Sequence, residues 1–435
     1  MSNNAIGRGL YVLNRIAANP LLDRLKIRRP LEKLIFTSVK HGFRLASATA
    51  RVFSSSGPKS PHPNRLNKPG QGSGLFDLTL SEEQQMLRDS LQRFAKEVLR
   101  PQASAADRDG AVPAEVRSAA QELGLALYAV PEALGGAATE DTVSSQMLIV
   151  EDLSHGDMGQ AVALLAPIHV ANALTRWGTA EQQDKYLSAF TGDDPPVATF
   201  ALTEPTPLFD AQALSTQARQ EGGDYILSGR KAMVALAAEA ELFLVSAQTP
   251  QGPAVFIVEG GTPGLSVEAE GTMGLKAAAM AAVVLDNVRV PAAQRLGAQA
   301  FDYEMFVDLG TLAWCALAVG TCQAVLDYVI PACNDRVAFG EPISHRQAVA
   351  FMIANIGIEL EAMRLMTWRA AARAEQGLPF HREAYLARVL VTEKAMQIGT
   401  DGVQLLGGHG FTKEHPVERW YRDLRATAFG HGLHL

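Results

Sequence analysis

The sequence contains few cysteines, and their spacing is not that of paired ligands. Cys315, Cys322 and Cys333 are the only cysteines in the 435 residues. Neither a disulfide framework nor a zinc site is therefore predicted. The neighbours of all three are mostly apolar, so we expect three core thiols in a protein of a reducing compartment, and no metal site.

The sequence also lacks a positive net charge and a long apolar run. Lys and Arg number 39 against 46 Asp and Glu, which gives a net charge of −7 and argues against a body that binds nucleic-acid phosphates. No stretch approaches the roughly 18 uninterrupted apolar residues of a membrane-spanning helix. With 47% hydrophobic and 20% charged residues, the chain is expected to fold into two or three domains.

Positive charge is concentrated in residues 1–53, which carry ten Lys and Arg side chains against two acidic ones. Apolar residues recur there at helical spacing between cationic ones: Leu31, Leu34, Ile35, Val39 and Phe43. This pattern predicts a basic amphipathic helix. It suits an anchor on an anionic membrane surface, a partner-docking helix, a mitochondrial presequence processed near Arg51, or an ordinary helix packed on its own protein. We expect a cytoplasmic protein with peripheral membrane contact, and the mitochondrial matrix is the alternative.

The rest of the sequence divides into a linker and three folded parts. Residues 54–74 are rich in Pro, Gly and Ser without an apolar period, which predicts a flexible linker. Helical signals run through 75–196, short β-rich segments through 197–298, and long Ala- and Leu-rich helical segments through 299–435. The sequence therefore predicts two helical domains with a small β-domain between them.

Individual helices can be placed from their end signals. Ser81 and Gln84 have the spacing of a capping box, and we expect the helix that they begin to end at Pro101. The long helices predicted in the last part span 303–330, 344–376 and 381–406.

Seven groups of short motifs follow one another in a fixed order along residues 76–432. They are Leu123-Gly124-Leu125 with Pro131-Glu132 and Gly135-Gly136; Gly178-Thr179-Ala180-Glu181-Gln182; Leu202-Thr203-Glu204-Pro205 ahead of Asp210; Gly223-Asp224-Tyr225-Ile226-Leu227-Ser228-Gly229-Arg230-Lys231; Asp286-Asn287-Val288-Arg289-Val290-Pro291; Arg336-Val337-Ala338-Phe339-Gly340 with His345 and Gln347; and Gln404 with Gly407-Gly408-His409-Gly410-Phe411. Together they resemble the acyl-CoA dehydrogenase family. The resemblance implies a mostly helical α+β fold with an N-terminal helical domain, a middle β-barrel and a C-terminal four-helix bundle. It also implies FAD as cofactor, an acyl-CoA thioester as substrate, and a dimer or tetramer.

The residue in the position of the catalytic base departs from the family pattern. In the family, a carboxylate removes the α-proton of the acyl thioester while a hydride leaves the β-carbon for the flavin. The glutamate that usually follows the Tyr-Arg-Asp run aligns with His431, and the second known position of the base aligns with Gly310. The chain thus resembles a degenerate member. A neutral imidazole can accept a proton, so His431 is the candidate catalytic residue, and the alternative is a surface histidine in a frayed tail.

The resemblance further implies a FAD site that is split between two subunits. In the half that would hold the isoalloxazine, Thr203 matches the family, whereas residues 206–209 and 233–235 replace a glycine-rich loop and a Trp-x-Thr that contact the flavin. The half that would hold a neighbour's pyrophosphate and adenine matches the family pattern, and packing of a subunit interface is the alternative role for it. Its candidate cofactor-binding residues are Arg336, Phe339, Gln347, Gln404, Gly407, Gly408 and Gly410.

Three functions follow from these features. In the favoured one, the chain is a degenerate subunit that completes the FAD site of a dehydrogenase partner in a homo- or hetero-oligomer. In the second, it is an autonomous acyl-CoA dehydrogenase with His431 or a carboxylate such as Glu304 as base. In the third, it is a flavin-free scaffold or acyl-binding protein held by its basic N-terminal segment. The intact pyrophosphate half favours the first function over the third, and the missing glutamate favours it over the second.

Overall fold

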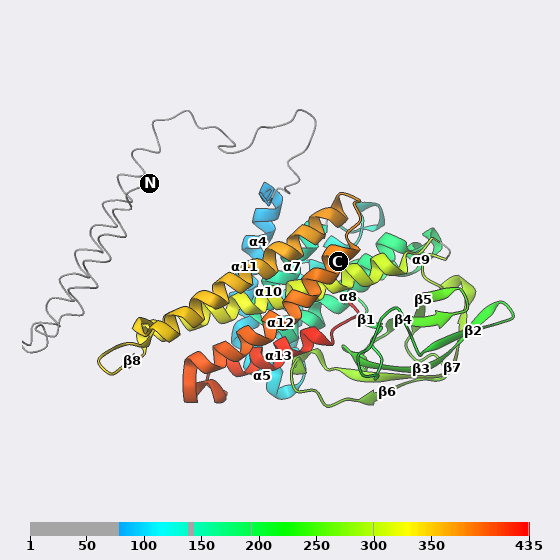
Figure 1. The fold of residues 1–435 in the computed structure, drawn as a ribbon. Coiled ribbons are helices and arrows are strands. Elements are labelled where there is room, and N and C mark those ends of the chain that lie inside the picture. Colours follow the sequence, from blue (N-terminus) through cyan, green and yellow to red (C-terminus); the bar gives the residue numbers. More distant parts are fainter. Residues whose placement is uncertain (1–77, 138–142, 193, 299, 434) are drawn as a thin grey trace, which may run out of the picture. The chain divides into compact units, whose positions relative to one another are not determined.

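The computed structural model describes residues 78–137, 143–192, 194–298, 300–433 and 435. They form a helical part, a β-domain and a second helical part in the predicted order, and Figure 1 shows the sheet at one end of a body of long helices. The predicted, mostly helical α+β fold is confirmed. The amphipathic helix of residues 1–53 and the linker of residues 54–74 lie outside the described residues and stay predictions.

The first helical part begins as predicted and continues further than predicted. Its helices are α4 (Glu82–Phe94), α5 (Arg100–Asp109), α6 (Ala114–Glu122), α7 (Val143–Gly156), α8 (Met158–Trp177) and α9 (Ala180–Tyr186), with the π-helical turn η1 (Ala95–Leu99) and the 3-10 turns η2 (Leu125–Ala129), η3 (Glu132–Leu134) and η4 (Leu187–Thr191). The backbone N–H of Gln84 donates to Ser81 Oγ at 3.1 Å, and the backbone N–H of Ser81 donates to Gln84 Oε1 at 3.1 Å. The predicted helix end at Pro101 is wrong, because η1 carries the chain into α5. Pro101 lies in the first turn of α5, where a missing backbone N–H is tolerated.

The β-domain is an open half-barrel. Its strands are β1 (Ala198–Ala201), β2 (Gln217–Glu221), β3 (Asp224–Val234), β4 (Leu242–Thr249), β5 (Gly252–Glu259), β6 (Leu265–Ala269) and β7 (Ala281–Pro291), with the turns η5 (Lys276–Ala278) and η6 (Ala292–Gln294). The sheet has the order β1-β4-β2-β3-β7-β6, and β5 pairs with β4. β1, β5 and β6 each pair with a single neighbour, so the barrel is not closed. β1 runs parallel to β4 with Ala201 opposite Val245, and the chain leaves β1 toward Thr203.

The last part contains three long helices and a short one. They are α10 (Tyr303–Asp335), α11 (Gln347–Glu375), α12 (His381–Leu406) and α13 (Val417–Leu424), with the hairpin of β8 (Val337–Ala338) and β9 (Glu341–Pro342) and the turns η7 (Ile343–His345), η8 (Gly407–Phe411) and η9 (Arg425–Ala428). The prediction for α12 is confirmed at both ends, whereas α10 runs beyond its predicted end at residue 330. The three cysteines lie on α10, buried and free as predicted.

Within the part of the chain that the structure describes, two helices are long and apolar enough to cross a membrane by length and composition alone. They are α8 and α10, whose apolar windows are 83% and 89% buried inside the protein. Such burial is typical of core helices, and both pack in the main hydrophobic core together with α7 and α12. Their apolar side chains therefore form the core of the protein.

Candidate functional site

Thr203 and His431, far apart in the sequence, line one small cavity. The other lining residues come from the β-domain, from α10 and from the last residues of the chain: Met233, Leu275, Met280, Trp314, Ala426, Phe429 and Gly430. The cavity has a volume of about 10 Å³, which suffices for about one water molecule. The structure thus brings the candidate base and the candidate flavin contact together, in a space that large side chains fill.

A buried ion pair holds the loop that carries Thr203. Lys231 Nζ lies 2.8 Å from Glu204 Oε1, and the two side chains are 0% and 1% exposed. The ammonium also donates to Leu202 O at 3.1 Å, and the carboxylate accepts the backbone N–H of Thr216 at 2.9 Å. Burial by itself would raise the pKa of Glu204, but the charge and hydrogen bond of Lys231 lower it to about 2. The ionised pair therefore ties the end of β1 to β3.

The imidazole of His431 is half-buried and uncharged at neutral pH. Its Nδ1 lies 3.0 Å from Phe429 O, and because a carbonyl only accepts, Nδ1 carries the hydrogen and Nε2 the lone pair. The ring meets the Phe209 ring edge-on, with centroids 5.2 Å apart. Burial, together with the charge of Arg388, lowers the pKa of His431 to about 4. His431 is therefore a neutral but weak proton acceptor, and the alternative of a surface histidine in a frayed tail does not describe it.

The other candidates for a base do not reach this cavity. Glu304 is 59% exposed in the first turn of α10, with Oε1 3.1 Å from His381 Nδ1. Asp308 also bonds His381 Nδ1 at 3.0 Å, and this bond raises the pKa of His381. At Gly310, a Cβ would lie 2.5 Å from Leu433 O, so no side chain fits. Among the residues that the structure describes, no carboxylate lines the cavity.

Two side-chain clusters within the described ranges have ligand atoms close enough to hold a metal ion. Their members are Glu304, Asp308 and His381, and His409, Glu414 and His415. The first cluster is the ion pair described above. In the second, the Tyr328 hydroxyl lies 2.7 Å from His415 Nδ1. Interactions within the protein thus account for part of both clusters, and the expectation of no metal stays a prediction.

Arg336 and the glycine turn predicted to contact a pyrophosphate lie together at the C-terminal end of α10. Arg336 is the exposed C-cap of α10, and its Nη1 donates to Leu406 O at 2.9 Å. Gly407 has φ +58° and ψ −132°, a conformation that favours glycine. A Cβ on Gly410 would lie 2.2 Å from Val403 O. The guanidinium therefore stands beside this turn, in which Gly410 packs against the chain's own backbone.

The remaining candidates for cofactor binding surround this turn at the surface. Phe339 lies at the tip of the β8–β9 hairpin and is 96% exposed, with the Arg346 guanidinium 5.6 Å from its ring centroid. Gln347 is the first residue of α11 and Gln404 lies in the last turn of α12, both exposed. Gly408 is exposed, with open space where a Cβ would lie.

The two sets of candidate residues lie toward opposite ends of α10. Trp314 lines the cavity of Thr203 and His431, whereas Arg336 ends the helix. At about 1.5 Å per residue, the helix puts roughly 33 Å between these two positions. In Figure 1, the hairpin at the end of α10 and the sheet accordingly lie on opposite sides of the molecule. The two sets therefore lie far apart on a single chain.

Three family models match successive parts of the chain. The acyl-CoA dehydrogenase N-terminal domain matches residues 81–193, the middle domain residues 199–288, and the C-terminal domain residues 304–434. The chain belongs to the acyl-CoA dehydrogenase family. The resemblance inferred from the motifs is thereby confirmed.

Individual members of this family match over most of their length. The short-chain specific acyl-CoA dehydrogenase, mitochondrial, of Bos taurus is 34% identical over 364 residues, which are 81% of this chain and 87% of that protein. The structure of butyryl-CoA dehydrogenase from Megasphaera elsdenii matches with a TM-score of 0.74 and 30% identity, covering 81% of this chain and 95% of that one. A FAD complex of PigA matches with a TM-score of 0.73 and 28% identity, covering 81% and 95%. The relatives named acyl-CoA dehydrogenases are oxidoreductases.

FAD fits one set of residues on this chain and not the other. The Arg336 set offers an exposed guanidinium, an aromatic edge and a glycine turn, which suit a pyrophosphate and its neighbouring groups. The cavity of Thr203 and His431, at about 10 Å³, has no room for the three-ring isoalloxazine. Trp314 and Gly430 close it, since a Cβ on Gly430 would lie only 2.3 Å from the Trp314 ring. We therefore assign no flavin-dependent catalytic step to this cavity in the conformation described.

Two further residues shape the cavity and carried no signal in the sequence. Trp314 lies in a long apolar helix whose side chains are buried on nearly every face, so periodicity does not single it out. Arg388, on α12, donates to Ala428 O at 3.3 Å and to Gly430 O at 3.2 Å. In the sequence it looks like one of the exposed charges of an amphipathic helix. Only the folded structure shows that it holds the chain next to His431.

Proposed function

We propose that this chain takes part in acyl-CoA dehydrogenation as a subunit that completes the FAD site of a partner. The observation that carries the proposal is the contrast between its two sets of residues. The Arg336 set is exposed and suits a pyrophosphate, whereas the cavity of Thr203 and His431 is almost filled by side chains. A chain with one usable half-site can complete a FAD site only with a neighbour that supplies the other half.

The chemistry of the chain's own cavity supports the same proposal. Bound FAD supplies the hydride acceptor in such a reaction, and the protein must supply a base for the α-proton. A base works best when its pKa lies near the working pH, whereas burial holds the pKa of His431 at about 4. The partner would therefore provide the base and the pocket for the reacting atoms, and this chain the groups that retain the cofactor.

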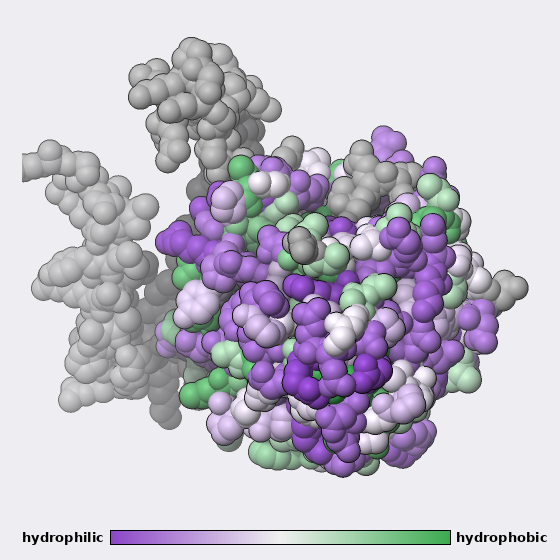
Figure 2. All heavy atoms as spheres, turned by 90° about the vertical axis from the view of Figure 1, so that its right-hand side faces the viewer, coloured by the Kyte–Doolittle hydropathy of each residue, from purple (hydrophilic) through white to green (hydrophobic). Residues whose placement is uncertain are grey.

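An exposed apolar stripe on the C-terminal helices supports assembly with another subunit. On α11, Phe351, Ile358 and Leu365 are 58%, 66% and 48% exposed and lie seven residues apart, so they share one face. On α12, Tyr385 and Val389 are 62% and 51% exposed. By contrast, Figure 2 shows a mainly hydrophilic surface with small apolar patches on the side that carries the sheet. Exposed apolar residues that share a helix face in this way are typical of subunit interfaces.

A second candidate function is that of an autonomous acyl-CoA dehydrogenase. The observation that favours it is the shared cavity of His431 and Thr203, in which His431 stands where the family places its glutamate. It would require the surrounding side chains to move and admit both the flavin ring and the substrate. The two functions differ in the flavin content of the chain on its own.

The isolated chain is expected to be purified with far less than one flavin per chain. Flavin absorbance, compared with protein concentration, measures this content before and after addition of excess FAD. An acyl-CoA series from butyryl- to palmitoyl-CoA then tests for bleaching of any bound flavin. A yellow protein with about one flavin per chain that an acyl-CoA bleaches would establish the autonomous enzyme and contradict the shared site.

A further inference from the structure

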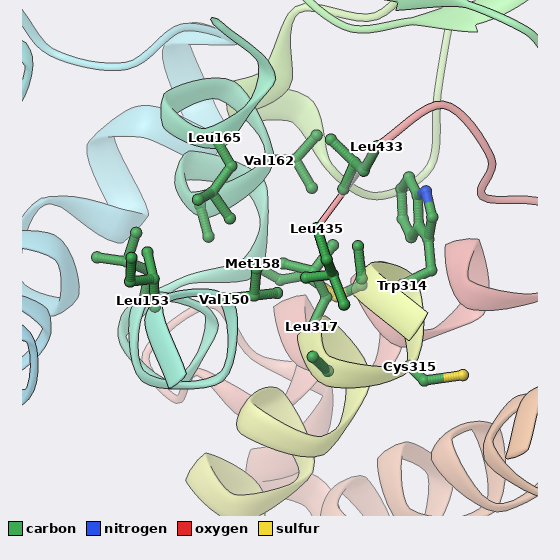
Figure 3. Close-up of a cluster of buried hydrophobic side chains, with 14 of the residues drawn as sticks. Val150, Leu153, Met158, Val162, Leu165, Trp314, Cys315, Leu317, Leu433 and Leu435 are labelled. Carbon is green, nitrogen blue, oxygen red and sulfur yellow. The ribbon is translucent and has the colours of Figure 1, made fainter. Parts of the chain in front are cut away.

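The last residues of the chain are inserted into the helical core. Leu433 is 2% exposed and Leu435 is fully buried. Figure 3 shows Leu435 beside Met158 and Leu317, and Leu433 beside Val162, residues that come from α8 and α10. This part of the core is thus filled by two leucines from residues 429–435, which lie beyond the last helical turn, η9.

Glycines bring this segment into direct contact with its neighbours. At Gly430 a Cβ would lie 2.3 Å from the Trp314 ring, and at Gly310 of α10 it would lie 2.5 Å from Leu433 O. Gly432 has φ +81° and packs against the Phe200 side chain, 3.1 Å from its own Cβ position. The segment therefore lies in a narrow slot between α10 and the end of β1.

Few hydrogen bonds hold the segment in the slot. Arg388 donates to Gly430 O at 3.2 Å, and Gly430 donates its N–H to Ala426 O at 2.8 Å. For His431, Gly432 and Leu433, no backbone hydrogen bond to another described residue is found. Opening of the segment therefore breaks few backbone hydrogen bonds, and its main cost is the exposure of the two leucines, which an apolar chain bound in their place would offset.

The segment in the slot also contributes residues to the lining of the cavity of Thr203 and His431. Trp314, Gly430 and His431 line that cavity, and Leu433 follows two residues after His431. Trp314 is 4% exposed, and its buried Nε1–H has no hydrogen-bond partner among the residues that the structure describes. An apolar slot next to an unpaired donor and an imidazole suits a ligand with a long apolar chain and a carbonyl at its head.

We propose that Leu433 and Leu435 occupy the binding slot of an acyl chain, and that an acyl-CoA must displace residues 429–433 and Leu435 to enter it. The proposal rests on the proposed function only for the class of ligand. The segment acts as an internal competitor. The apparent affinity for the ligand is therefore the intrinsic affinity multiplied by the fraction of time for which the slot is open. CoA without an acyl group has no chain to insert and does not compete with the segment.

The test compares octanoyl-CoA with CoA in calorimetric titrations of the flavin-free chain. If the slot is open about 1–10% of the time, a chain that ends after Gly432 binds octanoyl-CoA about ten- to a hundredfold more tightly than the full chain. Leu433→Ser gives a smaller gain in the same direction. The exposed Leu378→Ser is the matched control and leaves the affinity unchanged, as does CoA with every variant.

Circular dichroism and thermal unfolding establish that each variant is folded. If the shortened chain does not fold, amide hydrogen exchange of the full chain replaces it, and exchange at residues 429–433 rises when octanoyl-CoA is added. A folded shortened chain that binds octanoyl-CoA no more tightly, or exchange that does not rise, overturns the proposal. No flavin enters these measurements, so their outcome is separate from that of the shared FAD site.

Discussion

Replacing Arg336 by alanine is expected to weaken flavin retention by a mixed assembly about ten- to a hundredfold, where the partner is a family member with the catalytic glutamate. A charge-assisted bond from a guanidinium to a pyrophosphate contributes about 1.5–3 kcal/mol, and about 1.4 kcal/mol corresponds to a factor of ten. Arg336 is exposed, and its hydrogen bond goes to Leu406 O, so folding should change little. Flavin absorbance after dialysis measures retention, and thermal unfolding monitors the fold.

Two variants separate the fork of Arg336 from its charge. Arg336→Lys keeps the charge but loses the bidentate geometry, so its retention should lie between wild type and Arg336→Ala. Arg382→Ala removes a side chain that is 79% exposed at the start of α12, and it should retain flavin like wild type. If Arg336→Ala also retains flavin like wild type, in an assembly that binds flavin, Arg336 only packs the interface.

Replacing Lys231 by alanine is expected to lower the free energy of unfolding by about 3–5 kcal/mol, because the Glu204 carboxylate would be left buried without its counter-charge. Urea unfolding at pH 7 measures the loss. Lys231→Met keeps most of the apolar stem, so its loss reports the charge rather than the packing. Lys185→Ala breaks an exposed pair, 56% and 49% exposed, and should cost less than about 1 kcal/mol. Equal losses for Lys231→Ala and Lys185→Ala would show that the buried pair is not important.

The same ion pair gives the stability a pH dependence with a defined sign. The pKa of Glu204 falls from 4.5 to about 2 on folding, so its contribution is complete above about pH 4.5 and is lost as the pH falls toward 2. Glu204→Gln has no such proton to bind and should be less stable at neutral pH. The stability difference between wild type and Glu204→Gln should therefore shrink below pH 4.5, and a difference that stays constant with pH would contradict the assignment.

Features that depend on local sequence could be predicted for the fold. The helix ends at Ser81 and Leu406 follow from a side-chain cap and from a glycine with φ +58°, both of which act within a few residues. The continuation of the helix through η1 could not be predicted. A proline such as Pro101 usually ends a helix, and the π-helical turn before it has no local sequence signal. The openness of the sheet likewise depends on which strands pair across the domain.

The residues of the candidate site could be predicted from the sequence, but the volume of the cavity and the packing around it could not. Motif order pointed to Thr203 and His431, which share a cavity, and to Arg336 and Gly407, which lie at one turn. The volume of the cavity could not be predicted, because it depends on how Trp314 packs against residues more than a hundred positions away. Burial of an apolar segment next to His431 likewise depends on a slot formed by several helices.

The most direct test of the shared site is the flavin content of a purified mixed dimer of this chain and a glutamate-bearing relative. In the proposed assembly, each FAD site of a twofold dimer combines one subunit's cavity with the other's Arg336-type set, so only the site with the relative's cavity would hold a flavin. The account predicts about one flavin per mixed dimer, which acyl-CoA bleaches and which the Arg336→Ala variant retains about ten- to a hundredfold more weakly. About two flavins per mixed dimer, or none, would contradict it.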